Sequence, residues 1–294
     1  MTIRYRGGQP MPKNVQEALR YVGKVGMITR GTWYRYFGRG KMRWQQDQLL
    51  SLIKNNVLKK HSCARLEETW VLTESSIELL KKLGWPCVLP IPPQFIDHDE
   101  VVANSILTLE RNQICQMWLT ERELKTLKHR KYIVDDKDNE VKYPDAVFDL
   151  IFKGDPMTFA LEYERTGKSF SRYRSILNQY RKLDSVSLVL YVVESDTIKK
   201  TIQSVMKFIG DAVLVKKIAF IDAHEWKINP LKAQIQLRSK VITFDEIAAS
   251  KTAHTQIGSV FPCSESMPTS KKTPINPTSK PRSVFGCLTL LSPK

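Results

Sequence analysis

Two glutamates separated by a single residue stand out in the segment YPDAVFDLIFKGDPMTFALEYERTGKS, which runs from position 143 to 169. Glu162 and Glu164 interrupt a run that is otherwise apolar, and side chains two apart on a β-strand point to the same face. KGDP is a turn signal, so the segments on either side are predicted to form an antiparallel hairpin. If this hairpin closes around Asp155, Asp145 falls opposite Glu164 on that same face.

Three carboxylates at one end of a sheet repel one another unless protons or a cation compensate. Hard divalent cations such as Mg²⁺ or Mn²⁺ prefer oxygen ligands of this kind. We therefore predict a metal site formed by Asp145, Glu162 and Glu164. The alternative is a set of surface acids that pair with neighbouring Lys and Arg side chains. Lys168, which stands at the start of a basic helical segment, favours the functional site.

The elements that must position these acids are predicted from hydrophobic periodicity over residues 97–250. One helix is expected at VVANSILTLERN, and two more at SFSRYRSILNQYRKL and DTIKKTIQSVMKFIG. Strands are expected at QMWLTERELK, VKYPDAVFDLIF, MTFALEYE, SVSLVLYVV and VKKIAFIDA. This order predicts a mixed sheet flanked by helices, and hence an α/β fold, or α+β for the chain as a whole.

Residues 14–85 show a different pattern, in which three helical segments precede two short strands and a fourth helix. The order is typical of a winged helix-turn-helix, whose third helix enters the major groove of DNA. The third helix is expected to bury Trp44, Leu49, Leu50, Leu52 and Ile53. The predicted DNA-binding residues are Arg39, Lys41, Arg43, Gln45, Gln46, Lys59 and Lys60, together with Arg172 in the second region. The alternative is a protein-protein module with a solvated basic face.

Composition favours a phosphate-bearing partner, because 46 Lys and Arg against 30 Asp and Glu give a formal charge of +16. No run of 18 apolar residues and no secretory signal is present in the sequence, so we expect a cytoplasmic protein without a membrane span. Residues 86–96 are Pro-rich and predict a linker between two domains. Residues 251–294 are rich in Ser, Thr, Pro and Lys, which predicts a disordered basic tail.

The acids also resemble a known signature. Pro144-Asp145 and Glu162-Tyr163-Glu164 resemble the PD-(D/E)XK motif of nucleases, although Glu164 stands where that motif has Lys. The resemblance implies a restriction-endonuclease-like fold in which Asp145 and Glu162 bind Mg²⁺ or Mn²⁺. Glu164 would be a further ligand or would orient the attacking water, and Lys168 would supply the displaced cation. Glu110 and Glu121 are candidates for an additional acid, with an ordinary salt bridge as the alternative for both.

With the winged helix, the segments W-L-T-E, P-D-A and L-E-Y-E-R-T-G-K-S resemble the MobC-type plasmid mobilization relaxases and the related replication-relaxation proteins. This implies a DNA endonuclease that nicks double-stranded DNA at an origin of transfer during conjugative mobilization. An accessory mobilization protein, a coupling protein and a second copy of the chain are further partners left open. The alternatives are a non-catalytic regulator of plasmid replication or transfer, and a restriction or transposon-end endonuclease.

Tyrosine is not the expected nucleophile. Most relaxases use a Tyr beside a His-rich metal site, whereas the five histidines here form no H-x-H pair and no tight cluster. The strand pattern predicts that Tyr163 points away from the acids, and Tyr173 and Tyr180 share a helix face with apolar residues, which favours core packing. Water is therefore the expected nucleophile.

Overall fold

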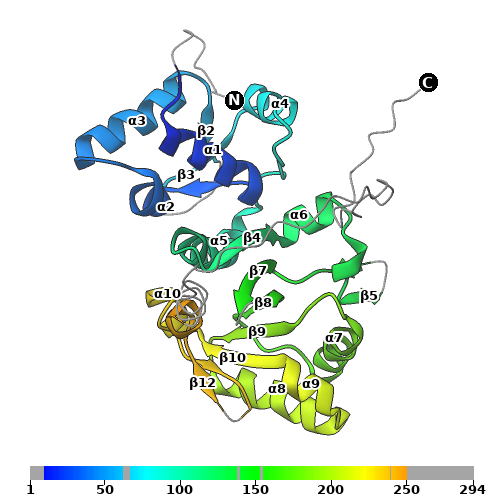
Figure 1. Ribbon diagram of the computed structural model, residues 1–294. Coiled ribbons are helices and arrows are strands. Elements are labelled where there is room, and N and C mark those ends of the chain that lie inside the picture. Colours follow the sequence, from blue (N-terminus) through cyan, green and yellow to red (C-terminus); the bar gives the residue numbers. More distant parts are fainter. Residues whose placement is uncertain (1–9, 62–66, 138–139, 153–154, 239, 250–294) are drawn as a thin grey trace, which may run out of the picture.

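The fold is seen in a computed structural model, which describes residues 10–61, 67–137, 140–152, 155–238 and 240–249 (Figure 1). The predicted tail over 251–294 lies outside the described residues.

The N-terminal region combines helices with a small antiparallel sheet of strand order β1-β3-β2. Its elements are α1 (Lys13–Val25), β1 (Ile28–Thr29), α2 (Arg30–Thr32), the π-helical turn η1 (Trp33–Phe37), α3 (Met42–Lys54), β2 (Leu58–Lys60), β3 (Thr69–Leu72) and α4 (Glu74–Lys82). Helix α4 begins after its N-cap Thr73, whose hydroxyl accepts a hydrogen bond from the Ser76 N–H.

The burial of α3 differs from the prediction. Leu49 and Leu52 are buried, but Trp44 and Leu50 are exposed. Only one narrow stripe of α3 therefore contacts the core, and the rest of the helix surface faces solvent.

The second region is built on a mixed sheet of seven strands in the order β12-β11-β10-β9-β8-β7-β4. Its elements are η2 (Pro93–Phe95), α5 (Ile96–Arg111), β4 (Cys115–Thr120), α6 (Glu121–Thr126), η3 (Arg130–Tyr132), β5 (Asp135–Lys137), β6 (Glu140–Lys142), β7 (Ala146–Phe152), β8 (Asp155–Glu164), α7 (Phe170–Lys182), β9 (Leu188–Val193), α8 (Asp196–Ile209), α9 (Ala212–Lys217), β10 (Ile218–Asp222), α10 (Ala223–Ile228), β11 (Ile235–Gln236) and β12 (Val241–Ile242). Strands β8, β9 and β10 run parallel, and the remaining neighbours pair antiparallel.

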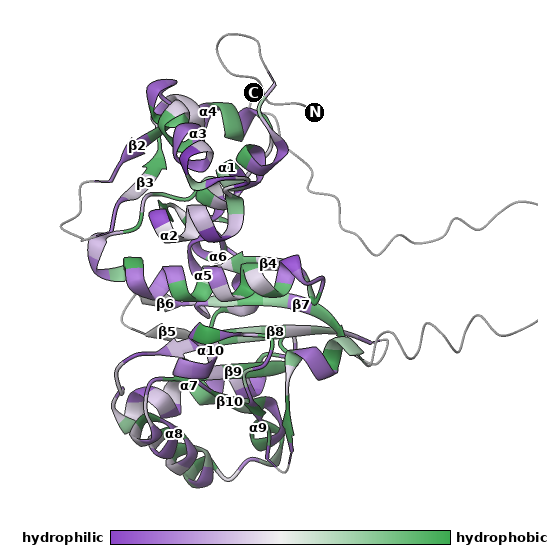
Figure 2. Cartoon of the chain, turned by 90° about the vertical axis from the view of Figure 1, so that its left-hand side faces the viewer, coloured by the Kyte–Doolittle hydropathy of each residue, from purple (hydrophilic) through white to green (hydrophobic). Residues whose placement is uncertain are grey.

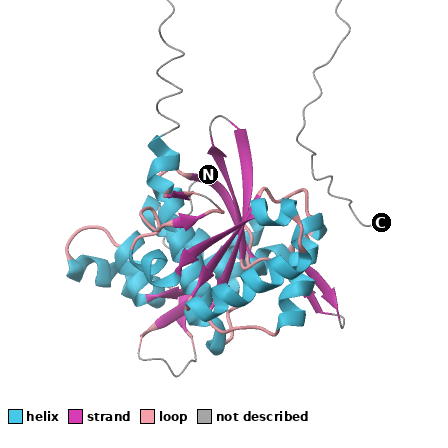
Figure 3. Cartoon of the chain, turned by 90° about the horizontal axis from the view of Figure 1, so that it is seen from below, coloured by secondary structure: helices cyan, strands magenta, loops and turns pink. Residues whose placement is uncertain are grey.

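Helices cover both faces of this sheet (Figures 1 and 3). Helices α5 and α10 pack on one face, and α7, α8 and α9 pack on the other. Apolar residues gather along the strands, whereas hydrophilic residues lie on the outer surfaces of the helices (Figure 2). The alternation of side chains along β8 therefore sends successive residues into two different hydrophobic layers.

Two predicted strands are partly helical. The segment LTERELK leaves the sheet after Thr120, because Thr120 and Glu123 form a capping box that starts α6. In VKKIAFIDA, the first residues belong to α9, whose N-cap Asp211 accepts hydrogen bonds from the N–H groups of Val213 and Leu214. In both segments local capping outweighs an apolar pattern that reads as a strand.

The two regions share a hydrophobic core, which runs from Met11 to Ile247. The Pro-rich segment 86–96 takes part in it through Ile91, and the Val88 N–H donates to the Gly23 carbonyl at 2.8 Å. Helix α5 lies between the N-terminal helices and the sheet (Figure 1). Within the described ranges, no helix combines the length and apolar character needed to cross a membrane.

A candidate active site at the carboxyl end of strand β8

The hairpin of β7 and β8 sets the positions of the acids. Ala146 pairs with Leu161 and Phe152 pairs with Asp155, so Asp145 comes level with Glu162 and not with Glu164 as predicted. The observed pairing register is thus shifted by two residues from the expected one. An even shift leaves the alternation along β8 unchanged, which is why Glu162 and Glu164 still share a face while Tyr163 occupies the other. Asp145 precedes the first residue of β7 and lies on the other side of the sheet from the two glutamates, so the prediction that all three acids share a face is wrong.

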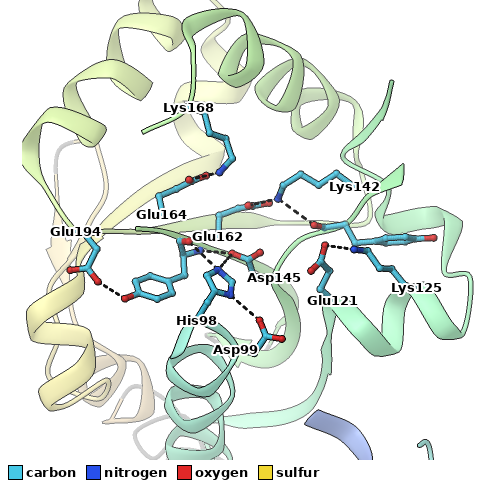
Figure 4. A network of polar contacts seen from close by, with 12 residues as sticks. His98, Asp99, Glu121, Lys125, Lys142, Asp145, Glu162, Glu164, Lys168 and Glu194 are labelled. Atoms are coloured by element: carbon cyan, nitrogen blue, oxygen red, sulfur yellow. Dashed lines mark hydrogen bonds and ion pairs between the residues drawn. The ribbon is translucent and has the colours of Figure 1, made fainter. Parts of the chain in front are cut away.

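Asp145 lies just before β7, on the side of the sheet against which α5 packs. Its Oδ2 accepts a hydrogen bond from the Tyr163 N–H at 2.7 Å and lies 3.3 Å from Nε2 of His98. The same Nε2 lies 3.2 Å from the Tyr163 carbonyl oxygen. One ring nitrogen of His98 therefore contacts both the Asp145 carboxylate and the Tyr163 carbonyl oxygen beside β8 (Figure 4).

His98 is held in place from behind. Its Nδ1 lies 3.0 Å from Oδ1 of Asp99, whose other oxygen accepts from Arg122 Nε at 3.0 Å. The imidazole also stacks on the Tyr163 ring, with 5.2 Å between the ring centroids. Burial lowers the pKa of His98, but the carboxylates of Asp145 and Asp99 outweigh it and raise that pKa to about 10. The ring is consequently an imidazolium at neutral pH.

Glu162 and Glu164 point to the opposite face, toward α7 (Figure 4). Their side chains are only 1% and 2% exposed. Glu162 accepts from Lys142 Nζ at 2.6 Å and from the hydroxyl of Tyr180, while Glu164 pairs with Lys168. Each glutamate therefore has its own lysine.

The environment shifts the pKa values of Glu162 and Asp145 in opposite directions. Burial raises the pKa of Glu162 to about 7, although Lys142 opposes the shift. For Asp145, burial is outweighed by His98, Lys142 and the Tyr163 N–H, which hold its pKa well below the ordinary range. Neighbouring carboxyl groups whose environments push their pKa values apart are common in active sites.

A cleft of about 620 Å³ opens beside these groups. It is lined by Pro92, Gln94, Phe95, His98, Asp99, Glu121, Arg122, Lys125, Asp145, Tyr163, Glu164, Arg165, Thr166 and Lys168. Glu121, a candidate for the additional acid, lines the cleft and also forms the alternative salt bridge, with Lys125 at 2.9 Å. Glu110 lies elsewhere, because it accepts a hydrogen bond from Trp118 Nε1 at 3.1 Å and lines a separate cavity.

The predicted convergence of three carboxylates on one metal ion is not the arrangement observed. Among the residues that the structure describes, no three His, Cys, Asp or Glu side chains are placed to hold one ion. His98, Lys142 and Lys168 each neutralise one acid instead. Oε1 of Glu164 nevertheless lies buried and makes no hydrogen bond within the described part of the chain. The oxygen-rich donor set fits a hard cation in chemistry, and Glu164 has an oxygen to offer one.

The predicted DNA-binding residues lie on and around α3 and β2. Arg39, Lys41, Arg43, Gln46, Lys59 and Lys60 are exposed. Gln45 is an exception, because it is half-buried and its Nε2 donates to the Gly40 carbonyl at 2.7 Å. Arg172 lies on α7, well apart in the fold from this surface.

Sequence reasoning missed His98 and Lys142, and it assigned Tyr180 only to the core. Lys142 is only three residues before Asp145, and this proximity in the sequence indicates a candidate partner for the acids. His98 belongs to α5, far from the motif in sequence, and only the packing of α5 on the sheet brings it to Asp145. Tyr180 is indeed buried, but its hydroxyl contacts Glu162.

Comparisons of the chain with models of protein families, with curated proteins and with solved structures found no match.

Proposed function

We propose that the chain is a metal-dependent DNA endonuclease, a relaxase that nicks a mobile-element origin of transfer. The observation that carries the proposal is the set of buried carboxylates at the end of β8, next to a cleft with basic residues. Burying Glu162 and Glu164 costs free energy unless they are paired, so a sheet end that concentrates acids and lysines is an expensive arrangement for a purely structural role.

The architecture supports both halves of this proposal. The helices α1 to α3 and the strands β1 to β3 follow the order of a winged helix-turn-helix, with α3 in the place of the recognition helix. Asp145, just before β7, and Glu162, on β8, lie at one end of adjacent strands of a mixed sheet flanked by helices, as in restriction-endonuclease-like folds. The formal charge of +16 supports a polyanionic partner.

Asp145, Glu162 and Glu164 would hold Mg²⁺ or Mn²⁺ only after giving up contacts that they make here, because His98, Lys142 and Lys168 pair with them. When bound, the ion would supply an activated water and neutralise charge on the scissile phosphate. Lys168 reaches the cleft from the loop before α7 and would stabilise negative charge on that phosphate. Lys142 is half-buried, pairs with Glu162 and fixes its carboxylate. Tyr180 holds the second oxygen of Glu162, so this acid presents one orientation.

The test uses supercoiled plasmid carrying the DNA that flanks the chain's own gene, incubated with the protein and Mg²⁺ or Mn²⁺. Wild-type protein is expected to yield open circles, and Asp145→Ala and Glu162→Ala are expected to leave the plasmid supercoiled. Asp149→Ala is the matched control, because Asp149 lies on β7 and bonds Thr158 at 2.7 Å, away from the cleft. Linear product would instead show a double-strand endonuclease.

A second candidate is a DNA-binding regulator without catalysis. It is favoured by one observation, that every acid of the site already has a cationic partner. Plasmid that is bound but uncut under either metal would support it. Lys41→Ala combined with Arg43→Ala is expected to weaken duplex binding and reduce its salt dependence under both candidates, because both use α3.

A further inference from the structure

Two exposed phenylalanines contact each other on the helical layer next to the site. Phe170 is the first residue of α7, and Phe208 lies near the end of α8. Their ring centroids are 5.5 Å apart with the planes at 82°, and the residues are 42% and 63% exposed. An aromatic pair this open leaves ring faces available to a planar partner.

Both helices that carry this pair are rich in basic residues. The Arg174 guanidinium lies 5.8 Å from the centroid of the Phe208 ring, and Lys207 precedes Phe208 in α8. Helix α7 carries no acidic residue, and its basic residues are Arg172, Arg174, Arg181 and Lys182. Helix α8 adds three lysines against one aspartate. The surface therefore combines exposed rings with positive charge.

The pair is joined to the cleft by the loop that precedes α7. Arg165, Thr166 and Lys168 line the cleft, and Phe170 follows two residues later. Lys168 lies 5.7 Å from the ring centroid of Tyr173, which anchors the first turn of α7 in the core. A strand leaving the cleft along this loop would arrive at the phenylalanines.

We propose that Phe170, Phe208 and Arg174 form a stacking platform for single-stranded DNA next to the active site. This rests on the proposed function, because nicking releases a strand end whose bases can unstack. Bases inside a duplex are already stacked and cannot lie on these rings, whereas single-stranded bases can, with little dependence on sequence. The basic residues of α7 and α8 match the phosphates of the same strand.

The test measures binding of a fluorescently labelled oligothymidine by anisotropy in EDTA, so that no cleavage takes place. Phe208→Ala is expected to weaken this binding about tenfold, as for the loss of one stacked base. Phe208→Trp is expected to retain it. Ile228→Ala is the matched control, because Ile228 on α10 is 61% exposed and has no place in the platform.

Binding of a labelled duplex provides the contrast. It is expected to be unchanged in Phe208→Ala, because α3 and not the platform recognises duplex DNA. Unchanged oligothymidine binding in Phe208→Ala, or an equal loss for duplex and single strand, would overturn the platform. Since binding in EDTA is independent of nicking, a protein that binds the oligothymidine through Phe208 but never nicks would contradict the proposed function alone.

Discussion

At the scale of single residues, the partners of Glu162 decide whether its buried charge is tolerated. Lys142 and Tyr180 hold one carboxylate oxygen each. Both partners approach from outside the strand that carries Glu162, one from β6 and one from α7. The acid is therefore fixed by three elements at once.

Replacing Tyr180 by Phe removes the hydroxyl and leaves a buried carboxylate oxygen without its donor. We expect Tyr180→Phe to lower the free energy of unfolding by about 2 kcal/mol, in the range of a hydrogen bond to a charged group. Chemical denaturation at a pH above the pKa of Glu162 measures this. Tyr191→Phe is the control, since the Tyr191 hydroxyl is buried without a hydrogen-bond partner among the described residues. An equal loss in both variants would contradict the role of Tyr180.

Glu123 gives a pH dependence that is separate from the candidate site. Burial raises its pKa to about 7 from an ordinary 4.5, against the opposing effects of Lys24 and Thr120. The folded state thus binds this proton more tightly than the unfolded state, so the contribution of Glu123 to stability is greatest at low pH and falls as the pH rises from about 4.5 to about 7.

Glu123→Gln should remove this loss, because the amide keeps an oxygen for the Thr120 N–H, which now donates to Glu123 at 2.9 Å. Relative to wild type, we expect the variant to gain about 2 kcal/mol in the free energy of unfolding between about pH 5 and about pH 8. Urea denaturation at the two pH values checks the result. A difference between variant and wild type that does not change with pH would show that Glu123 titrates normally.

At the scale of elements, α5 connects the N-terminal region to the site. Its first turns carry His98, which contacts Asp145, and Asp99, which contacts His98. Glu100, on the same helix, accepts from the Thr32 hydroxyl at 2.9 Å. Further along, Asn104 accepts from the Tyr21 hydroxyl at 2.9 Å. One rigid helix therefore touches both the predicted DNA-binding region and the acids.

Asn104→Ala should weaken this connection. It leaves the buried Tyr21 hydroxyl and the Thr32 hydroxyl without the side chain they contact, so we expect a loss of about 2 kcal/mol in the free energy of unfolding. Asn112→Ala, at the exposed C-cap of the same helix, is the control and should cost much less. Similar losses for the two variants would mean that the contacts of Asn104 contribute little.

At the scale of the whole molecule, the shared core predicts one cooperative unfolding transition. Trp33 and Trp70 are buried in the N-terminal region, Trp118 and Trp226 are buried in the second, and all four belong to one hydrophobic cluster. Urea unfolding followed by tryptophan fluorescence and by far-UV circular dichroism should therefore coincide. Two separated transitions would show that residues 86–96 join regions that fold independently.

The sequence alone predicted the hairpin of β7 and β8, the helices α7 and α8, and the common face of Glu162 and Glu164. Each depends on local periodicity or turn chemistry, which act over a few residues. The exact register of the hairpin was predicted wrongly, since it depends on how many residues the turn takes up. The starts of α6 and β10 were also predicted wrongly, because capping competes there with an apolar pattern.

Only the tertiary structure decided the distant partners of the acids, whereas the pair of Glu164 with Lys168 spans four residues and was one of the alternatives read from the sequence. His98 reaches Asp145 because α5 packs across the sheet, and Tyr180 reaches Glu162 because α7 covers the other face. Lys142 and Lys168 divide the two glutamates between them, so the acids lie paired with cations and not gathered around one point. Contacts between residues distant in sequence follow from how helices and sheet share a core, and no local pattern encodes them.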